Sequence, residues 1–234
     1  MDGNPLKFQL EYAGKHTDQF MWDNNTDVPL SYRFNNQGFR FDKDLTDVKN
    51  PCVVYLGDST TFGMGVEHEQ TWAFQHHKIH HAELEYINLG AVAGSIETTH
   101  RLLTYWSDHL DIKHAYILHP NINRQEFISS NEIESVGFWN TKMAMDMGGF
   151  WQNTEQNRFK QKLFLDLVSQ ERHQYWLQKR CEHALGYLKT IIDLKCSFPI
   201  PTDFNKGSRD GFHAGPNEHR EILNWFEDES NIMV

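Results

Sequence analysis

The chain has 234 residues, of which 39% are hydrophobic, and it carries 22 lysines and arginines against 32 acidic residues. This length predicts one domain whose core needs no disulfide or metal. A net charge of −10 without a basic stripe excludes a typical nucleic-acid-binding protein and disfavours an anionic membrane surface. The cysteines, Cys52, Cys181 and Cys196, have neither disulfide nor zinc spacing, and Cys52 is expected in the core.

The beginning of the chain lacks the basic and apolar regions of a signal peptide. No apolar run approaches the roughly 20 residues that a membrane-spanning helix requires. Together with the scattered cysteines, these features predict a cytoplasmic protein without a membrane span.

Residues 1–50 are polar and irregular, and we expect them to form a lead-in that wraps the domain. Residues 51–234 are expected to form the domain proper, in which apolar runs and helical patterns alternate from Cys52 onward. An insertion at about 125–153 interrupts this rhythm, because it is rich in asparagine, glycine, methionine and aromatic residues.

The alternation predicts an α/β fold with a mostly parallel sheet and helices on both faces, a three-layer α/β/α sandwich. Its first strand, Cys52–Leu56, is a continuous apolar run typical of a strand covered on both faces. The segment Ile191–Phe198 fits either a fourth strand or the end of a helix. The other expected elements are helices over Thr71–His81, Ile96–His109, Glu155–Lys189 (interrupted near Ser169–Arg172) and Pro216–Glu227, and strands over Leu84–Leu89 and Ala115–His119.

A Gly-Asp-Ser turn, Gly57 to Ser59, follows the first strand directly. Ligand sites of parallel α/β sheets lie beyond the carboxyl ends of the strands, so Ser59 is a candidate nucleophile. The alternative interpretation, with about equal weight on this motif alone, is an ordinary helix cap made by Asp58 and Ser59. A P-loop is excluded because no Lys-Ser/Thr pair follows, and Thr61 stands where a Gly-x-Ser-x-Gly elbow has its last glycine.

Near the other end of the chain, Asp210 precedes His213 by three residues, so one turn can bring both side chains to the same side. In an acyl-transfer site, His213 would accept the proton of Ser59 and Asp210 would hold the imidazole. A surface pair at a helix start is the common explanation of such spacing. The flanking Gly211 and Gly215 favour a specific loop instead.

An acyl-transfer site also needs hydrogen-bond donors for the oxyanion. The segment after the second strand contains Gly94, whose backbone N–H is one candidate. The segment after the third strand offers the amide side chains of Asn121 and Asn123. Taken singly, these are ordinary loop glycines and turn asparagines; their significance comes from their position at successive strand ends.

These blocks resemble those of the SGNH hydrolases, the GDSL-type esterases and lipases. Gly57 to Ser59 resembles the first block, Gly94 the glycine of the second, Asn123 the asparagine of the third, and Asp210 with His213 the last. The resemblance covers roughly residues 30–227, including a lead-in segment before the first block. It implies a flavodoxin-like fold and a shallow, exposed site.

Three positions depart from the pattern of the family. Thr60 replaces a leucine and Ala214 a proline. The third block reads Asn121-Ile122-Asn123-Arg124, which makes Asn121 a rival of Asn123 for the oxyanion and places a cation where an acid is usual. Arg124 is expected either to contact a substrate anion or to pair within the fold.

The sequence therefore predicts a serine esterase without cofactor or metal, with Ser59, His213 and Asp210 as the triad. Ser59, Gly94 and Asn123 are its expected oxyanion donors. Its substrates, by resemblance, are small acyl esters of carbohydrate or lipid. The alternatives are an acyltransferase that uses the same site and a catalytically silent binding or assembly module.

Three further segments are assigned no catalytic role. The histidines of segment 76–81 are expected on a solvated helix face, in preference to a metal site. The stretch 138–151, rich in methionine and aromatic residues, suits either a substrate-facing flap or a core-packing insertion. Residues Leu163, Phe164, Leu167 and Val168 are expected to pack against the sheet.

Overall fold

The computed structural model describes residues 13–18, 30–120, 124–128, 133–137, 155–197, 213–228 and 232–233. The strands of the central sheet are β3 (Cys52–Leu56), β4 (Glu85–Asn88), β5 (Ile112–Leu118), β8 (Asp193–Ser197) and β9 (Ile232–Met233). Outside that sheet, β1 (His16–Thr17) pairs with β2 (Tyr32–Arg33), and β6 (Gln125–Ile128) pairs with β7 (Ile133–Val136). The helices are α1 (Ser59–Phe62), α2 (Trp72–His80), α3 (Ile96–Ser107), α5 (Glu155–Leu163), α6 (Glu171–Leu188) and α7 (Pro216–Glu227), with 3-10 turns η2 (Leu45–Asp47) and η3 (His68–Gln70) and a π-helical segment η5 (Phe164–Val168).

The central sheet has the order β4-β3-β5-β8-β9. Its first four strands are parallel, and β9 pairs antiparallel with β8. Counted along the chain within the sheet, this order is 2-1-3-4-5, which is the flavodoxin-type order. The order reverses direction between β3 and β5, so the crevice beyond the carboxyl ends of these two strands is the expected ligand site.

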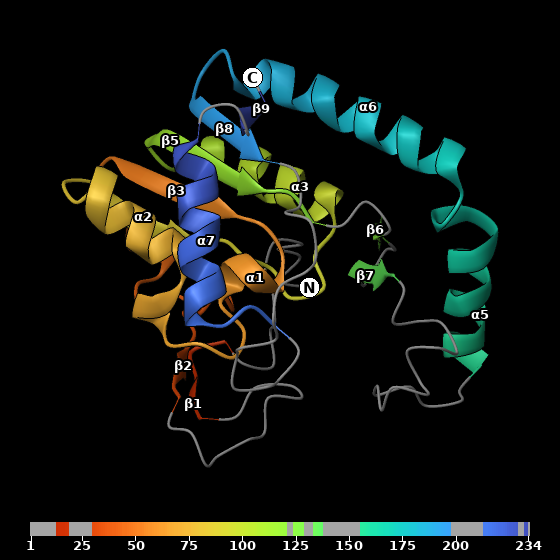
Figure 1. The fold of residues 1–234 in the computed structure, drawn as a ribbon, viewed down its shortest axis with the longest axis horizontal. Helices are drawn as coiled ribbons and strands as arrows, with labels where there is room; N and C mark the ends of the chain where they lie inside the picture. Colours follow the sequence, from red (N-terminus) through yellow and green to blue (C-terminus); the bar gives the residue numbers. More distant parts are fainter. Residues whose placement is uncertain are drawn as a thin grey trace.

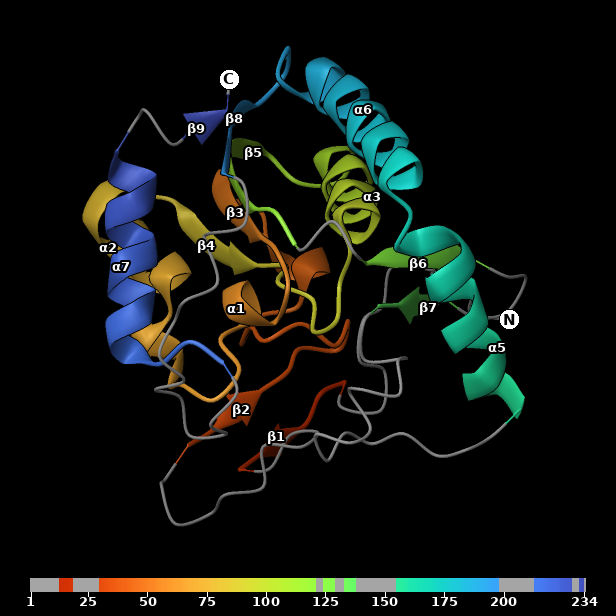
Figure 2. The ribbon, with the colours of Figure 1, turned by 45° about the vertical axis from the view of Figure 1, so that its right-hand side comes forward.

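Helices cover both faces of the sheet, with α2 and α7 on one side and α3 and α6 on the other (Figures 1 and 2). Successive side chains of β3 alternate between these faces, as the pleat of a strand requires. Cys52, Val54 and Leu56 belong to the core on the α3 and α6 side, and Val53 and Tyr55 to the core on the α2 and α7 side. All five are fully buried, which is why this strand is continuously apolar.

The predicted three-layer α/β fold is confirmed. β3 and α7 have the bounds expected from the sequence, and Cys52 lies in the core. The segment 191–198 contains a strand, β8. The long helical stretch is interrupted at Ser169 and Gln170, within the expected interval. None of the described helices combines the length and apolar character needed to cross a membrane.

Residues 163–168 do not pack as expected. Phe164 and Val168 are buried against Val136 of the β6–β7 hairpin and belong to a separate cluster from the central sheet. Leu167 is 37% exposed. The helical pattern alone identifies an apolar stripe but not the surface that covers it.

The expectation of a solvated histidine face on α2 is wrong for His76, His77 and His81, which are buried. The reason lies in the tyrosines of the sheet, whose buried hydroxyls need partners. The Tyr55 hydroxyl pairs with Nδ1 of His76 at 2.9 Å, and the Tyr116 hydroxyl pairs with Nε2 of His81 at 2.7 Å. The described residues contain no group of three or more His, Cys, Asp or Glu side chains suited to hold a metal ion.

Burial lowers the pKa of His76 to about 3 and that of His81 to about 4, with smaller contributions from neighbouring histidines. Both pKa values lie below that of an unfolded histidine, so the folded state resists protonation. The stability associated with neutral His76 is therefore complete above about pH 6.5 and is lost as the pH falls toward the folded pKa.

We predict that the free energy of unfolding falls by about 1.4 kcal/mol per pH unit for each such histidine well below pH 6.5. Urea denaturation from pH 7 down to about pH 4 measures the slope. His76→Gln removes one titrating group and should reduce the slope by about 1.4 kcal/mol per pH unit. His109→Gln changes a histidine at an exposed position after α3 and serves as the comparison. Equal slopes in His76→Gln and the unaltered protein would contradict the prediction.

Candidate active site

Ser59 is the first residue of α1 and directly follows the turn at the carboxyl end of β3. The preceding Asp58 is the N-cap, and its carboxylate accepts the N–H of Thr60 at 3.0 Å. Ser59 is 6% exposed, and no described residue lies within hydrogen-bond distance of its hydroxyl. The capping role therefore belongs to Asp58, and the Ser59 hydroxyl is left available for another function.

Close packing fixes the turn before Ser59. A Cβ atom on Gly57 would lie 2.1 Å from Oγ1 of Thr61 and 2.7 Å from the carbonyl oxygen of Leu118. The turn therefore passes directly between α1 and the end of β5, where only glycine fits. This close approach places Ser59 beside the boundary between β3 and β5, where the strand order reverses.

The end of β4 supports α1 from below. The Asn88 side chain donates to the carbonyl oxygen of Thr61 at 2.9 Å and accepts the N–H of Gly90 at 2.8 Å. A Cβ atom on Gly90 would lie 2.3 Å from the backbone nitrogen of Phe62. The helix that carries Ser59 thus rests directly on the backbone of Gly90.

Arg40, from the lead-in, holds the other end of α1. Its guanidinium is buried and donates to the carbonyl oxygens of Gly63, Val66 (2.8 Å) and Ser31 (3.1 Å). It also lies over the ring of Tyr32, 4.5 Å from the centroid. Burial lowers the pKa of Arg40, because the charged guanidinium is less stable away from water.

The segment after β4 forms a tight turn that ends at Gly94. The N–H of Gly94 donates to the carbonyl oxygen of Ala91 at 2.8 Å, and Ala93 adopts a left-handed conformation with φ of 60°. A non-glycine residue in this conformation stores of the order of 1–3 kcal/mol of strain. The predicted oxyanion donor Gly94 is thus near α3, whose N-cap is Ser95, but its N–H is already engaged.

Arg124 follows β5 and joins the three strand ends. Its guanidinium donates to Oδ2 of Asp58 at 2.6 Å, and the same nitrogen lies 3.5 Å from the carbonyl oxygen of Gly94. Of the two roles expected for Arg124, the structure therefore shows pairing within the fold. The ion pair neutralises the charge that would otherwise attract a substrate anion.

His213 is half-buried and lies two residues before Gly215, the N-cap of α7. The charge of His213 makes a smaller contribution, after burial and the charge of Arg40, to the lowered pKa of His219. His219 is fully buried, and its Nδ1 accepts the N–H of Trp72 at 3.1 Å. This bond fixes the start of α7 against the start of α2. Burial is the main cause that lowers the pKa of His219 to about 3.

The structure thus brings Asp58, Gly94 and Arg124 together, beside Ser59. Asp210, Asn121 and Asn123, together with the stretch 138–151, lie outside the described residues. Sequence reasoning missed Asn88 and Arg40 as supports of α1. The signal for Asn88 was an amide at the end of a buried strand, two residues before a glycine. The signal for Arg40 was a cation placed directly between two phenylalanines.

No protein-family model matches the chain, and no curated protein matches it either.

We predict that Gly90→Ala lowers the free energy of unfolding by about 3 kcal/mol, because the added methyl group collides with the backbone of α1. Gly186→Ala is the matched control: Gly186 lies within α6, and a Cβ atom there would meet nothing within 4 Å. It should stabilise the helix by about 0.5–1 kcal/mol. Urea denaturation measures both, and equal effects would show that α1 does not rest on Gly90 as described.

We also predict that Arg124 and Asp58 are coupled in stability. Arg124→Met and Asp58→Asn each break the ion pair, and Asn retains the ability to cap α1. A double-mutant cycle should give an interaction energy of about 1–2 kcal/mol, measured by urea denaturation. Additivity within about 0.3 kcal/mol would mean that the pair contributes nothing to the fold.

Proposed function

We propose that the chain is a serine esterase that hydrolyses small acyl esters of carbohydrate or lipid, with Ser59 as nucleophile. The observation that carries this proposal is the Ser59 hydroxyl, which makes no hydrogen bond to a described residue and lies at the strand-order reversal, beside three strand ends held together by Arg124. The hydroxyl of an ordinary cap serine accepts a backbone N–H of its helix, whereas here the Asp58 carboxylate accepts that hydrogen bond.

In the proposed reaction, Ser59 Oγ attacks the ester carbonyl carbon while His213 accepts the hydroxyl proton. The tetrahedral intermediate collapses, the C–O bond of the ester breaks, and His213 returns the proton to the departing alcohol. Water then attacks the acyl-enzyme with His213 as base, which releases the carboxylic acid and restores Ser59. Asp210 would orient the imidazole throughout.

The oxyanion would accept a hydrogen bond from the backbone N–H of Ser59, which donates to no described residue. Gly94 can contribute by sharing its hydrogen between Ala91 and the oxyanion in a three-centre bond. The Asn123 side chain, with Asn121 as rival, would complete the site. A single good donor contributes about 3–4 kcal/mol to transition-state stabilisation.

The resemblance to SGNH hydrolases supports this assignment, and the departure at Arg124 is compatible with it. An unpaired cation would favour an anionic substrate, but Arg124 is paired with Asp58. The proposed substrates are therefore uncharged near the reacting ester. The same site would make an acyltransferase if a sugar hydroxyl replaced water in the second step.

We predict that a fluorophosphonate probe labels Ser59 and that Ser59→Ala abolishes both labelling and hydrolysis of p-nitrophenyl acetate. The rate should fall by at least about a thousandfold, since removal of one triad member has effects of this size or larger. Intact-mass spectrometry and peptide mapping identify the labelled residue. The melting temperature should stay close to that of the unaltered protein, since the Ser59 hydroxyl makes no bond to a described residue.

Ser107→Ala, at the far end of α3, is the matched control and should keep full activity, because among the described residues the Ser107 hydroxyl bonds only the carbonyl oxygen of Thr104. If Ser59 is never labelled and Ser59→Ala hydrolyses the ester normally, the esterase assignment is wrong and a binding or assembly module replaces it. Added sugar alcohols test transfer: an acylated sugar in place of the free acid would identify an acyltransferase.

A further inference from the structure

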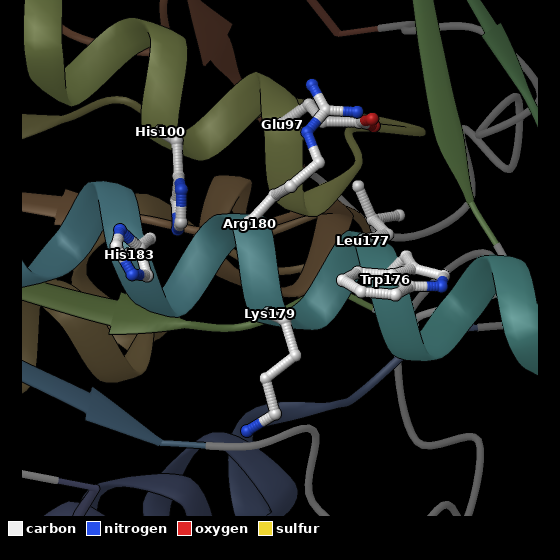
Figure 3. Close-up of a pocket in the computed structure, with 7 residues that line it drawn as sticks. All are labelled: Glu97, His100, Trp176, Leu177, Lys179, Arg180 and His183. Atoms are coloured by element: carbon white, nitrogen blue, oxygen red, sulfur yellow. The ribbon is translucent and has the colours of Figure 1, made fainter.

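A groove of about 560 Å³ lies between α3 and α6, on the sheet face opposite α2 and α7 (Figure 3). Glu97 and His100 line it from α3, and Trp176, Leu177 and Arg180 line it from α6. Lys179 and His183 complete the lining. None of the residues assigned to the candidate active site belongs to this set.

His100 shows that this groove is more than a packing defect. The residue is 6% exposed, and its Nε2 atom is buried without a hydrogen-bond partner among the described residues. Figure 3 shows the ring extending from α3 toward α6, within the groove. A buried polar atom without a partner is costly, and because His100 lines the groove, a ligand bound there would supply the missing bond.

The charges of the groove balance one another. Arg180 reaches from α6 to the Glu97 side chain, and its charge acts on that carboxylate (Figure 3). Lys179 points away from α3 and forms an ion pair with Glu182 at 2.6 Å. Burial lowers the pKa of His100 to about 4, so this ring is neutral at neutral pH. A ligand that matches the groove is therefore uncharged.

Trp176 adds a flat apolar surface. Its side chain is 66% exposed although it is one of the largest apolar groups of the chain, and it stands next to the buried Leu177 at the edge of the groove. An exposed indole favours a ligand with a planar apolar face. The Glu97 carboxylate and the Arg180 guanidinium, both in the lining of the groove, offer an acceptor and a fork of N–H donors, which suit adjacent hydroxyl groups.

We propose that the groove between α3 and α6 binds a neutral sugar, whose apolar ring face lies on Trp176 and whose hydroxyls meet His100, Glu97 and Arg180. A pyranose has this combination of one apolar face, several hydroxyls and no charge. The site is separate from Ser59, so the inference does not depend on esterase activity.

The experiment uses the full chain and a panel of neutral methyl pyranosides (glucoside, mannoside, galactoside, N-acetylglucosaminide) and their linear oligosaccharides, with glucuronic acid as the charged comparator. Isothermal titration and saturation-transfer NMR measure binding. At least one neutral member should bind with a Kd of about 1 mM or below, as expected for a ligand of this size. Glucuronic acid should bind more weakly than the glucoside.

Trp176→Ala should weaken this binding by about tenfold, because it removes the apolar platform. Tyr187→Ala is the matched control: Tyr187 is 67% exposed on the same helix but does not line the groove. Its affinity should equal that of the unaltered protein. Ser59→Ala should also leave binding unchanged, which separates this site from the candidate active site.

His100→Leu gives the sharpest test. Because Nε2 of His100 has no partner among the described residues, leucine removes no described hydrogen bond at this atom, and the melting temperature should rise or stay equal. Affinity for the sugar should nevertheless fall by about fivefold. The proposal is overturned if no neutral pyranoside binds, if Trp176→Ala leaves binding intact, or if the charged comparator binds best.

Discussion

The buried guanidinium of Arg40 is the constraint on which the candidate site depends. It donates to carbonyl oxygens at both sides of the turn that ends α1, and no carboxylate among the described residues accepts from it. A buried cation without a carboxylate partner is stable only when its bonds to carbonyl oxygens are kept. The segment after Phe62 is therefore fixed in one conformation. Since α1 has only four residues, fixing its end also fixes Ser59 at its start.

The second constraint is the convergence of strand ends. Parallel strands deliver the segments after β3, β4 and β5 to one edge of the sheet, but this alone leaves their loops unspecified. Asn88 and Gly90 bring the segment after β4 against α1, and Arg124 binds the segment after β5 to Asp58. The Arg124 cation thus stands where the resemblance leads one to expect an acid, and its role is to hold the loops together.

Much of the fold was predictable because its signals are local. The continuous apolar run of β3 reflects burial on both faces, and Pro216 at the first turn of α7 marks a helix start. The site was less predictable because its supports are distant in sequence. Burial of His76 depends on a hydroxyl of Tyr55, 21 residues away, and the pairing of Arg124 depends on Asp58, 66 residues away. No local pattern encodes such partners, so the sequence alone left a solvated histidine face and two roles for Arg124.

Helix α3 connects the candidate active site with the groove between α3 and α6. Its N-cap, Ser95, follows Gly94 directly, and Glu97 in its first turn accepts from the Ser95 hydroxyl and from the N–H of Glu126, both at 3.1 Å. Two hydrogen bonds thus hold the Glu97 carboxylate independently of Arg180. A side chain that is already fixed loses little conformational entropy when a ligand binds. The affinity for the ligand is therefore reduced less by the cost of ordering that side chain. The bonds that hold Glu97 at the start of α3 therefore also prepare the polar end of the groove.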